Sequence, residues 1–249
     1  MLALRFTAAL AVLSAAVASA QTTPAPANQK FTFIETVIRP EARGSYGSTL
    51  KAFCAAIVKG GAKTCHISST EMFGDLDKFV ILIPLDHYAH FDEGTYFSKG
   101  ASAEEQKRIN GERARAEFSA NESTVNLIGS LSLDSNKEPH FMHVTEIQVR
   151  PGMQQGFYDD VEKMELPAAK KAGLTDFWVY KTLQGGSPDR MFIVTPFDKF
   201  ADMDKGNPLF AAMGKENFAT FQQHTAAYTE KVSYSVAVYR KDLSASAAK

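Results

Sequence analysis

The chain has 249 residues, of which 45% are apolar and 22% charged, and its formal net charge is −1. This balance excludes the strongly basic surface of a nucleic-acid-binding protein, and we expect no nucleic-acid partner. The 18 Phe, 8 Tyr and single Trp residues can fill a hydrophobic core of ordinary size.

The first 20 residues have the pattern of a secretory signal peptide. They contain one charged residue, Arg5, then an apolar stretch at 6–17 and the small residues Ala18-Ser19-Ala20, which match a cleavage site of A-x-A type. The apolar stretch is shorter than the roughly 20 residues of a membrane-spanning helix, and no later segment is apolar enough to predict a membrane span. We therefore expect an exported protein, periplasmic or secreted, whose residues 21–29 form a flexible tail.

The rest of the chain contains an internal repeat. The segment ETVIRP at 35–40 recurs as EIQVRP at 146–151, an offset of 111 residues. The segment PLDHYAHFDEG at 84–94 recurs as PFDKFADMDKG at 196–206, an offset of 112. Two matches in the same order at nearly the same offset indicate a duplication.

This duplication predicts two modules, at 30–134 and 138–243, followed by a loose tail at 244–249. Each module has the same expected order of elements, which is strand, helix, strand, strand, helix, strand. The expected strands lie at 31–38, 64–70, 79–83 and 124–133 in the first module, and at 141–149, 177–183, 191–195 and 231–240 in the second.

The first helix of each module has an apolar stripe at helical spacing. In the first module this helix is expected to end at Gly60-Gly61. In the second module Pro167 lies inside the helix and should kink or split it. The stripes consist of Tyr46, Leu50, Phe53 and Ile57 in the first module, and of Met153, Phe157, Val161, Met164, Ala168 and Ala172 in the second.

A β-α-β-β-α-β order is that of the ferredoxin-like fold, in the α+β class. One such sheet has helices on one face only, and a tandem copy can cover the other face. With the strand-to-helix segment Arg150-Pro151-Gly152, this order resembles the dimeric α+β barrel superfamily in a fused form, two tandem ferredoxin-like βαββαβ modules forming a pseudo-dimeric α+β barrel. That superfamily includes NIPSNAP-like proteins, antibiotic-biosynthesis-type monooxygenases and chlorite dismutase. The resemblance implies a monomer or weak dimer but no particular activity, because the superfamily hosts many unrelated chemistries.

Alternation along the expected strands predicts which side chains face the barrel interior. The predicted inner face is both polar and aromatic, which suits a small apolar or aromatic ligand. It contains the catalytic candidates Glu35, His66 and Glu146 and the ligand-binding candidates Ser68, Gln148, Trp178 and Tyr180.

Glu35 and Glu146 occupy equivalent positions in the two modules. Burying a charged carboxylate costs several kcal/mol unless it is paired or protonated, so either residue could be a general base with a raised pKa. In the alternative interpretation, each glutamate pairs with the arginine that ends its strand, Arg39 or Arg150. Repetition in both modules favours a structural role, because usually only one copy keeps an active site.

Haem-using relatives in the superfamily depend on an axial histidine, and the candidates here are His66, His143 and His224. None of the three lies in a recognisable motif. We therefore expect no cofactor, and we expect no metal site.

The two cysteines are Cys54, on the core side of the first helix, and Cys65, on the helix-facing side of the next strand. In an oxidising compartment a single pair of cysteines favours a disulfide, and the tight turn between these elements makes that geometry feasible. The alternative is a pair of buried thiols.

Three functions are compatible with these observations. The first is an exported protein that binds a small apolar or aromatic ligand inside the barrel. The second is a cofactor-independent monooxygenase-like enzyme with Glu35, His66 or Glu146 as base. The third is a structural module whose barrel is filled by side chains such as Phe33, Trp178 and Tyr180.

Overall fold

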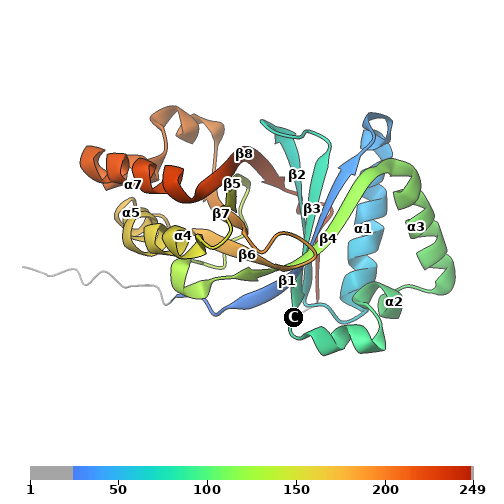
Figure 1. The fold of residues 1–249 in the computed structure, drawn as a ribbon. Helices are drawn as coiled ribbons and strands as arrows, with labels where there is room; N and C mark the ends of the chain where they lie inside the picture. The colour runs from blue at the N-terminus through green and yellow to red at the C-terminus, as the bar shows by residue number, and fades with distance from the viewer. Residues whose placement is uncertain (1–24, 248–249) are drawn as a thin grey trace, which may run out of the picture.

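The structure is a computed structural model that describes residues 25–247, so the predicted signal peptide at 1–20 lies outside the described residues. The described residues form two α+β modules that share one closed barrel, with helices on two opposite sides of it (Figure 1). Among these residues, no helix combines the length and the apolar character that a membrane crossing requires.

The first module contains four strands and two main helices in ferredoxin-like order. Its strands β2 and β3 alternate buried and partly buried side chains, as expected when one face lies on a hydrophobic core. The helix α3 begins with a capping box, in which Ser102 and Glu105 satisfy each other's backbone N–H groups. The elements are β1 (Gln29–Ile38), η1 (Pro40–Ala42), α1 (Arg43–Lys59), β2 (Thr64–Met72), β3 (Lys78–Leu85), η2 (Tyr88–Glu93), α2 (Tyr96–Gly100), α3 (Ala103–Ala116), β4 (Glu117–Leu127) and η3 (Gly129–Leu131).

The second module repeats this order, with its first helix divided into three segments. A last short strand follows the module. The elements are β5 (Phe141–Val149), α4 (Gln154–Asp160), the π-helical turn η4 (Val161–Glu165), α5 (Leu166–Lys171), β6 (Trp178–Gln184), β7 (Arg190–Phe197), η5 (Phe200–Lys205), α6 (Pro208–Met213), α7 (Lys215–Tyr228), β8 (Thr229–Tyr239) and β9 (Ala245–Ser246).

The eight long strands close into one antiparallel barrel. The strand order is β4-β1-β3-β2 in the first module and β8-β5-β7-β6 in the second. The edge strands of one module pair with those of the other, β4 with β6 and β2 with β8. Each module would otherwise expose two unpaired strand edges, so the two modules complete each other.

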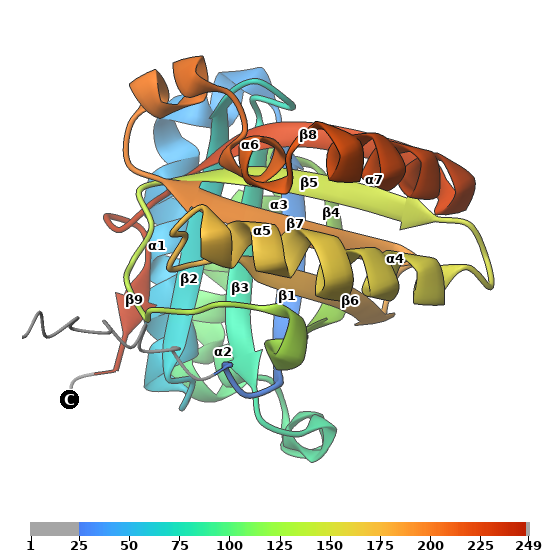
Figure 2. The ribbon, with the colours of Figure 1, turned by 90° about the vertical axis from the view of Figure 1, so that its left-hand side faces the viewer.

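Helices cover the outside of the barrel, with α1 and α3 on one side and α4, α5 and α7 on the other (Figures 1 and 2). Each helical layer encloses a separate hydrophobic core against the outer face of its own sheet. A third apolar cluster lies inside the barrel and includes Phe31, Phe33, Phe192, Trp178 and Tyr180. The fold therefore has three layers of packing, of which only the central one is shared by both modules.

Two sequence predictions at the module ends were wrong. The last strand of the first module was expected at 124–133, but β4 runs from Glu117 to Leu127. Its first half is polar and exposed, because there it pairs with β1 alone, so it lacks an alternating apolar pattern. The expected loose tail at 244–249 contains β9, which pairs with β2, and the preceding Leu243 is buried in the core of the first module.

Candidate functional site

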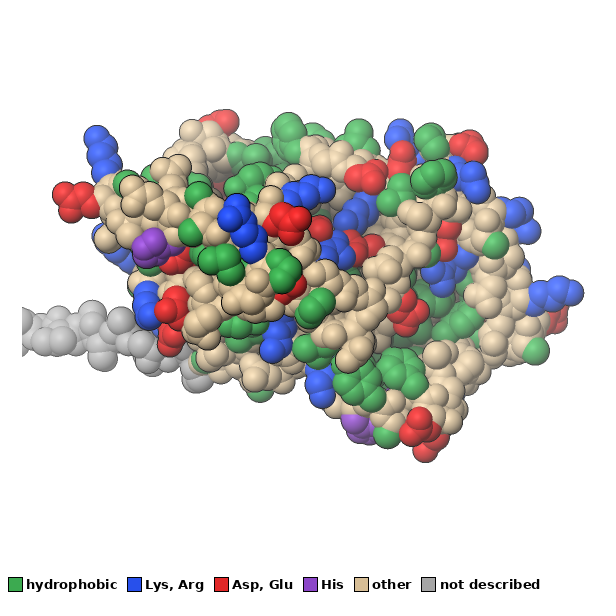
Figure 3. Space-filling view, in the orientation of Figure 1, with side chains coloured by type: hydrophobic (Ala, Val, Ile, Leu, Met, Phe, Trp, Pro, Cys, Tyr) green, Lys and Arg blue, Asp and Glu red, His purple; other side chains and the backbone are tan. Residues whose placement is uncertain are grey.

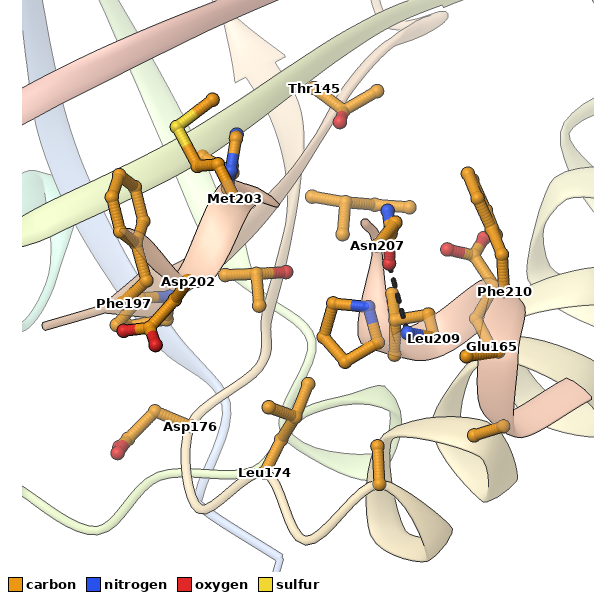
Figure 4. A pocket seen from close by; sticks show the side chains of 18 of the residues that line it. Thr145, Glu165, Leu174, Asp176, Phe197, Asp202, Met203, Asn207, Leu209 and Phe210 are labelled. Carbon is orange, nitrogen blue, oxygen red and sulfur yellow. Dashed lines mark hydrogen bonds between the residues drawn. The ribbon is translucent and has the colours of Figure 1, made fainter. Parts of the chain in front are cut away.

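A cavity of about 1070 Å³ lies in the second module, between the outer face of its sheet and helices α5, α6 and α7. Figure 4 shows Glu165 and Phe210 on one side of this space and Phe197 and Met203 on the other. Side chains from the sheet and from α7 complete the lining, among them Thr145, Ile147, Ile193, Phe221, Thr225, Tyr228 and Val232.

The lining of the cavity is apolar inside and charged at its opening. Ile147, Ile193 and Leu209 are each at most 5% exposed. Lys137 and Asp198 lie at the surface, where they form an ion pair at 3.7 Å. The inner part therefore suits an apolar or aromatic group, and the opening can accept a polar substituent.

Glu165 and Asp176 are two buried acids that line this cavity. Ser135 and Thr175 donate hydrogen bonds to the carboxylate of Asp176. Glu165 is only 5% exposed. Burial, together with the negative charge of Asp160, raises the pKa of Glu165 to about 8. A carboxyl group in this position is protonated at neutral pH and can give up its proton at slightly higher pH.

The π-helical turn η4 places Glu165 in the cavity wall. At its end the N–H of Leu166 donates to the carbonyl of Val161, five residues back. Pro167 follows directly, and in a regular α-helix its ring would clash with the carbonyl four residues earlier. A π turn widens the backbone at this point, and the predicted split of the helix is seen as its division into α4, η4 and α5.

The π turn contains one residue that the first module lacks. The helix α1 has 17 residues, whereas α4, η4 and α5 have 7, 5 and 6, which is one more in total. The repeat offset is 111 before this helix and 112 after it, so the extra residue lies within it. Buried positions then correspond on both sides of the turn, as the pairs Tyr46/Phe157, Thr49/Asp160, Leu50/Val161, Phe53/Glu165, Cys54/Leu166 and Ile57/Ala169.

This correspondence explains why the cavity forms in the second module. In the first module Phe53 packs against Phe97, with ring centroids 5.0 Å apart, and the guanidinium of Arg113 lies 4.8 Å from the Phe53 ring. At an offset of 112 their counterparts are Leu209 and Thr225, both of which line the cavity. Smaller side chains thus replace Phe97 and Arg113, and a carboxyl replaces the Phe53 ring.

Behind Glu165, Asp160 and His224 connect α4 to α7. One carboxylate oxygen of Asp160 lies 2.9 Å from Nδ1 of His224, and the other is buried without a hydrogen-bond partner. Tyr228 is also buried here, and burial is the largest of the effects that raise its pKa, with Asp160 and Glu165 adding to it. The site thus concentrates acidic side chains around Glu165.

Glu35 and Glu146 lie inside the barrel rather than in this cavity. Arg190 bonds both of them, and Nζ of Lys78 lies 2.6 Å from Glu35. Burial acts to raise the pKa of Glu35, but the bonds and charges of Arg190 and Lys78 outweigh it and lower that pKa. Glu35 is therefore an ionised structural group and a poor general base at neutral pH.

The predicted pairing of these glutamates with Arg39 and Arg150 was wrong. Residues four apart on one strand are about 13 Å apart, farther than cross-strand neighbours. Lys78 and Arg190 lie on the neighbouring strands β3 and β7 and are therefore closer to Glu35 and Glu146. The Nε of Arg39 instead donates to the carbonyl of Arg115.

The other predicted site residues are also placed outside the cavity lining. Trp178 and Tyr180 pack in the apolar cluster inside the barrel. Nδ1 of His66 lies 3.2 Å from the Tyr239 hydroxyl, and burial lowers the pKa of His66. Ser68 faces Val80 and Tyr239 across the neighbouring strands, and the side-chain amide of Gln148 donates to the Ser187 hydroxyl at 3.0 Å.

Strand alternation thus predicted the inner face of the barrel, whereas no sequence pattern predicted the cavity. Glu165 was not among the predicted site residues because it lies beside an apolar helical stripe and belongs to no polar motif. Two signals were available, the proline inside the helix and the change in repeat offset from 111 to 112. Together they mark an irregular helical turn of the kind often found at functional sites.

Of the three histidines considered as axial ligands, His143 lines the cavity. Its ring lies against that of Phe197, with centroids 4.8 Å apart, and burial lowers its pKa. Within residues 25–247, no three His, Cys, Asp or Glu side chains are grouped so that they could hold a metal ion.

Cys54 and Cys65 lie in the other module, far along the chain from this site. Their Cα atoms are 5.4 Å apart, and the structure joins them by a disulfide. The bond ties α1 to β2 in the core of the first module. Its counterpart position in the second module is Leu166, so the second module has no equivalent link.

No family model and no curated protein matches this sequence. Solved structures do share its fold. An anthrone oxidase-like protein superposes with a TM-score of 0.66 at 13% identity, covering 91% of this chain and 97% of its own. Two proteins described as putative monooxygenases, from Lactobacillus acidophilus NCFM and Fusobacterium nucleatum subsp. nucleatum, each give a TM-score of 0.56. Their identities are 10% and 11%, and they cover 88% and 86% of this chain and 97% and 94% of their own.

At these identities the likeness shows the fold alone. This chain has the ferredoxin-like α+β barrel fold of these monooxygenase-like proteins, in the form that the order of its elements predicted. The activity has to be argued from the site, because one such fold can host many reactions.

Proposed function

We propose that the second module binds a small apolar or aromatic molecule in the cavity between its sheet and its helices. The observation that carries this proposal is the cavity itself, whose volume of about 1070 Å³ is that of a small-molecule site. Buried apolar side chains of its lining, among them Ile147, Ile193 and Leu209, can contact such a molecule, and the buried acids Glu165 and Asp176 add polar groups.

The contents of the barrel support this position over the barrel interior. Phe33, Trp178 and Tyr180 pack there against Phe31 and Phe192, so aromatic side chains occupy the space that a ligand would need. Ion pairs between Glu35, Glu146 and Arg190 also lie within the barrel. The interior therefore suits a role in holding the two modules together.

Binding of fluorene, a small aromatic hydrocarbon, measured by calorimetry tests the proposal. Thr225→Arg, which introduces the residue of the first module, should fill the cavity and abolish binding. Trp178→Phe, inside the barrel, is the matched control and should leave binding unchanged. Loss of binding in Trp178→Phe but not in Thr225→Arg would place the ligand inside the barrel and contradict the proposal.

A second candidate function is cofactor-independent oxidation of such a ligand. The observation that favours it is Glu165, a buried carboxyl in the cavity wall whose pKa of about 8 suits proton exchange near neutral pH. The fold neighbours described as monooxygenases and anthrone oxidase-like support the same class of reaction.

Anthrone is a suitable probe of this second function. Its methylene group can lose a proton to ionised Glu165, and reaction of the resulting carbanion with O₂ gives anthraquinone and water. One oxygen atom enters the ring carbonyl, and the other leaves as water with the two methylene hydrogens. Formation of anthraquinone above the uncatalysed rate, lost in Glu165→Gln but kept in Glu35→Gln, would support it; an equal rate in Glu165→Gln would contradict it.

We also propose that the protein works outside the cytoplasm. The pattern of residues 1–20 supports this, and a disulfide is most stable in an oxidising compartment. The denatured mass of protein from a periplasmic extract tests it. Cleavage after Ala20 and the loss of two hydrogens are expected, whereas an uncleaved cytoplasmic protein with free thiols would contradict it.

A further inference from the structure

We propose that the cavity recognises its ligand through a carbonyl oxygen on an aromatic ring system, which accepts a hydrogen bond from protonated Glu165. This inference rests on the proposed function, in which an aromatic molecule occupies the cavity. It adds the class of ligand, namely a neutral aromatic ketone or quinone, and it identifies the group that selects it.

The position of Glu165 supplies the first argument. The residue is 5% exposed and lines the cavity, on the same side of it as Phe210 (Figure 4). It takes the position that Phe53 fills with an aromatic ring in the first module. Packing alone would favour an apolar residue there, because an unpaired buried carboxyl lowers stability. A polar group retained at a buried position and facing open space is suited to a ligand.

The protonation state supplies the second argument. No cation is among the influences on Glu165, which are burial and the negative charge of Asp160. Both effects favour the neutral form, in which a carboxyl group has one O–H donor. A buried acid that stays neutral can donate a hydrogen bond to a carbonyl oxygen at physiological pH.

The surrounding titratable groups do not change this conclusion. From α4, Asp160 contributes a negative charge, which lies next to His224 of α7. From α7, Tyr228 has a raised pKa and is therefore neutral. Lys171 of α5 lines the cavity, but its ammonium group donates to the carbonyl of Ala212 at 2.9 Å. His143 of β5 has a lowered pKa and favours its neutral form, and α6 contains no titratable residue.

This electrostatic environment disfavours an anionic ligand. A carboxylate or phenolate beside Glu165 would add negative charge near Asp160, whose second oxygen is already buried without a partner. A neutral ligand avoids this repulsion and can still accept the proton of Glu165. The apolar lining then contacts the rings, so one hydrogen bond fixes the orientation of an otherwise apolar molecule.

A purely structural role would account for only part of this arrangement. The pair Asp160–His224 corresponds to Thr49–Glu112 in the first module, where Oγ1 of Thr49 donates to Glu112 at 2.9 Å and links α1 to α3. The pair Asp160–His224 therefore also links two helices. Helix attachment does not explain why Glu165 replaces a phenylalanine or why its carboxyl faces the cavity.

The test compares two probes of nearly equal size, 9-fluorenone, which has a carbonyl, and fluorene, which has a methylene at the same position. We expect the wild-type protein to bind 9-fluorenone about three- to tenfold more tightly than fluorene at pH 6, as one added hydrogen bond predicts. The preference should disappear above pH 9, where Glu165 has lost its proton. Calorimetry or competition with a fluorescent aromatic dye measures both affinities.

Three variants assign the effect to the proposed groups. Glu165→Leu should bind both probes equally at each pH, because it offers no donor. Glu165→Gln should keep the preference at pH 6 and at pH 9, because its amide N–H₂ does not titrate. Asp160→Asn leaves Glu165 buried but removes the negative charge that further favours its protonated form, so the preference should disappear at a lower pH than in the wild type. Glu112→Gln in the first module is the matched control and should behave as the wild type.

The outcomes separate this inference from the function on which it rests. Equal binding of the two probes by the wild type at pH 6 would overturn the inference and leave the binding function intact. A preference that persists in Glu165→Leu would also overturn it, because another group would then donate the bond. Failure of the folded wild type to bind either probe would overturn both proposals.

Discussion

Arg190 of the second module donates two hydrogen bonds to Glu35 of the first, at 2.5 and 2.8 Å. The same guanidinium also donates to Glu146 at 2.7 Å, and Lys78 neutralises the remaining charge on Glu35. Lys78 and Arg190 occupy equivalent repeat positions, as do the two glutamates. The duplicated residues therefore form one balanced network of two anions and two cations that joins the modules inside the barrel.

Replacing Glu35 by glutamine should lower the free energy of unfolding by about 3 kcal/mol, because two largely buried cations lose a partner. Urea denaturation measures this change. Glu122→Gln, at an exposed position on β4, is the control and should change the stability by less than about 0.5 kcal/mol. An unchanged midpoint in Glu35→Gln would mean that the network contributes no net stability.

The acid sensitivity of the protein should depend on the same residue. The pKa of Glu35 is below its unfolded value of 4.5, so the folded state favours the ionised form. The stabilisation is then complete above pH 4.5 and is lost as the pH falls through the lowered folded pKa. The free energy of unfolding, measured at several pH values between 3 and 6, should fall less steeply with decreasing pH in Glu35→Gln than in the wild type.

Glu165 should give the opposite dependence on pH. Its pKa of about 8 is above its unfolded value of 4.5, so between these values only the folded state holds the proton. The contribution of Glu165 to stability is therefore complete below pH 4.5 and falls as the pH rises toward 8, by up to about 1.4 kcal/mol per pH unit. Glu165→Gln should remove this decline, whereas Glu162→Gln, exposed in the same π turn, should retain it. Identical pH profiles for the two variants would contradict the raised pKa.

The Cys54–Cys65 disulfide should stabilise the first module without affecting the cavity. It closes a short loop, with a sequence separation of 11, for which chain-entropy arguments give about 2–3 kcal/mol. The double variant Cys54→Ala, Cys65→Ala should lose that amount in chemical denaturation and should bind fluorene as the wild type does. Loss of fluorene binding in the folded variant would show that the two modules are coupled through this bond.

Leu243, at the end of the second module, should stabilise the core of the first. It is 6% exposed and packs in the cluster that contains Tyr46 and Leu50. Leu243→Ala should lower the free energy of unfolding by about 2–4 kcal/mol, the usual cost of such a cavity. The exposed Leu76 gives the control, since Leu76→Ala removes little buried surface. Equal, small effects of both variants would mean that the C-terminal segment is not docked in solution.

Much of the fold could be predicted from the sequence, because duplication and strand alternation are local patterns. The two repeated segments gave the order of elements in both modules, and alternation placed Glu35, Glu146, Trp178 and Tyr180 on one face of the barrel. The contacts of those residues could not be predicted in the same way. Arg190 lies 155 positions from Glu35 in sequence, and only closure of the barrel brings the two together.

The cavity could not be predicted from the same patterns, because it forms where the side chains between the helices and the sheet are too small to fill the space. Each substituted residue, such as Leu209 for Phe97, is an ordinary core residue when taken alone. Open space appears only when the smaller residues face each other across helices whose positions are fixed by the sheet. Periodicity in the sequence describes which face is buried, but it does not measure how well that face is filled.

The extra residue of the π turn has a consequence for how the two halves of this barrel can differ. In a barrel assembled from two identical subunits, any insertion is present twice, so both helical layers would be opened and weakened together. A single chain that contains both halves is free of that symmetry. Here one half keeps an aromatic core and a cross-link, which stabilise the whole, and the other half can hold a poorly packed, acidic interior without the chain losing its fold.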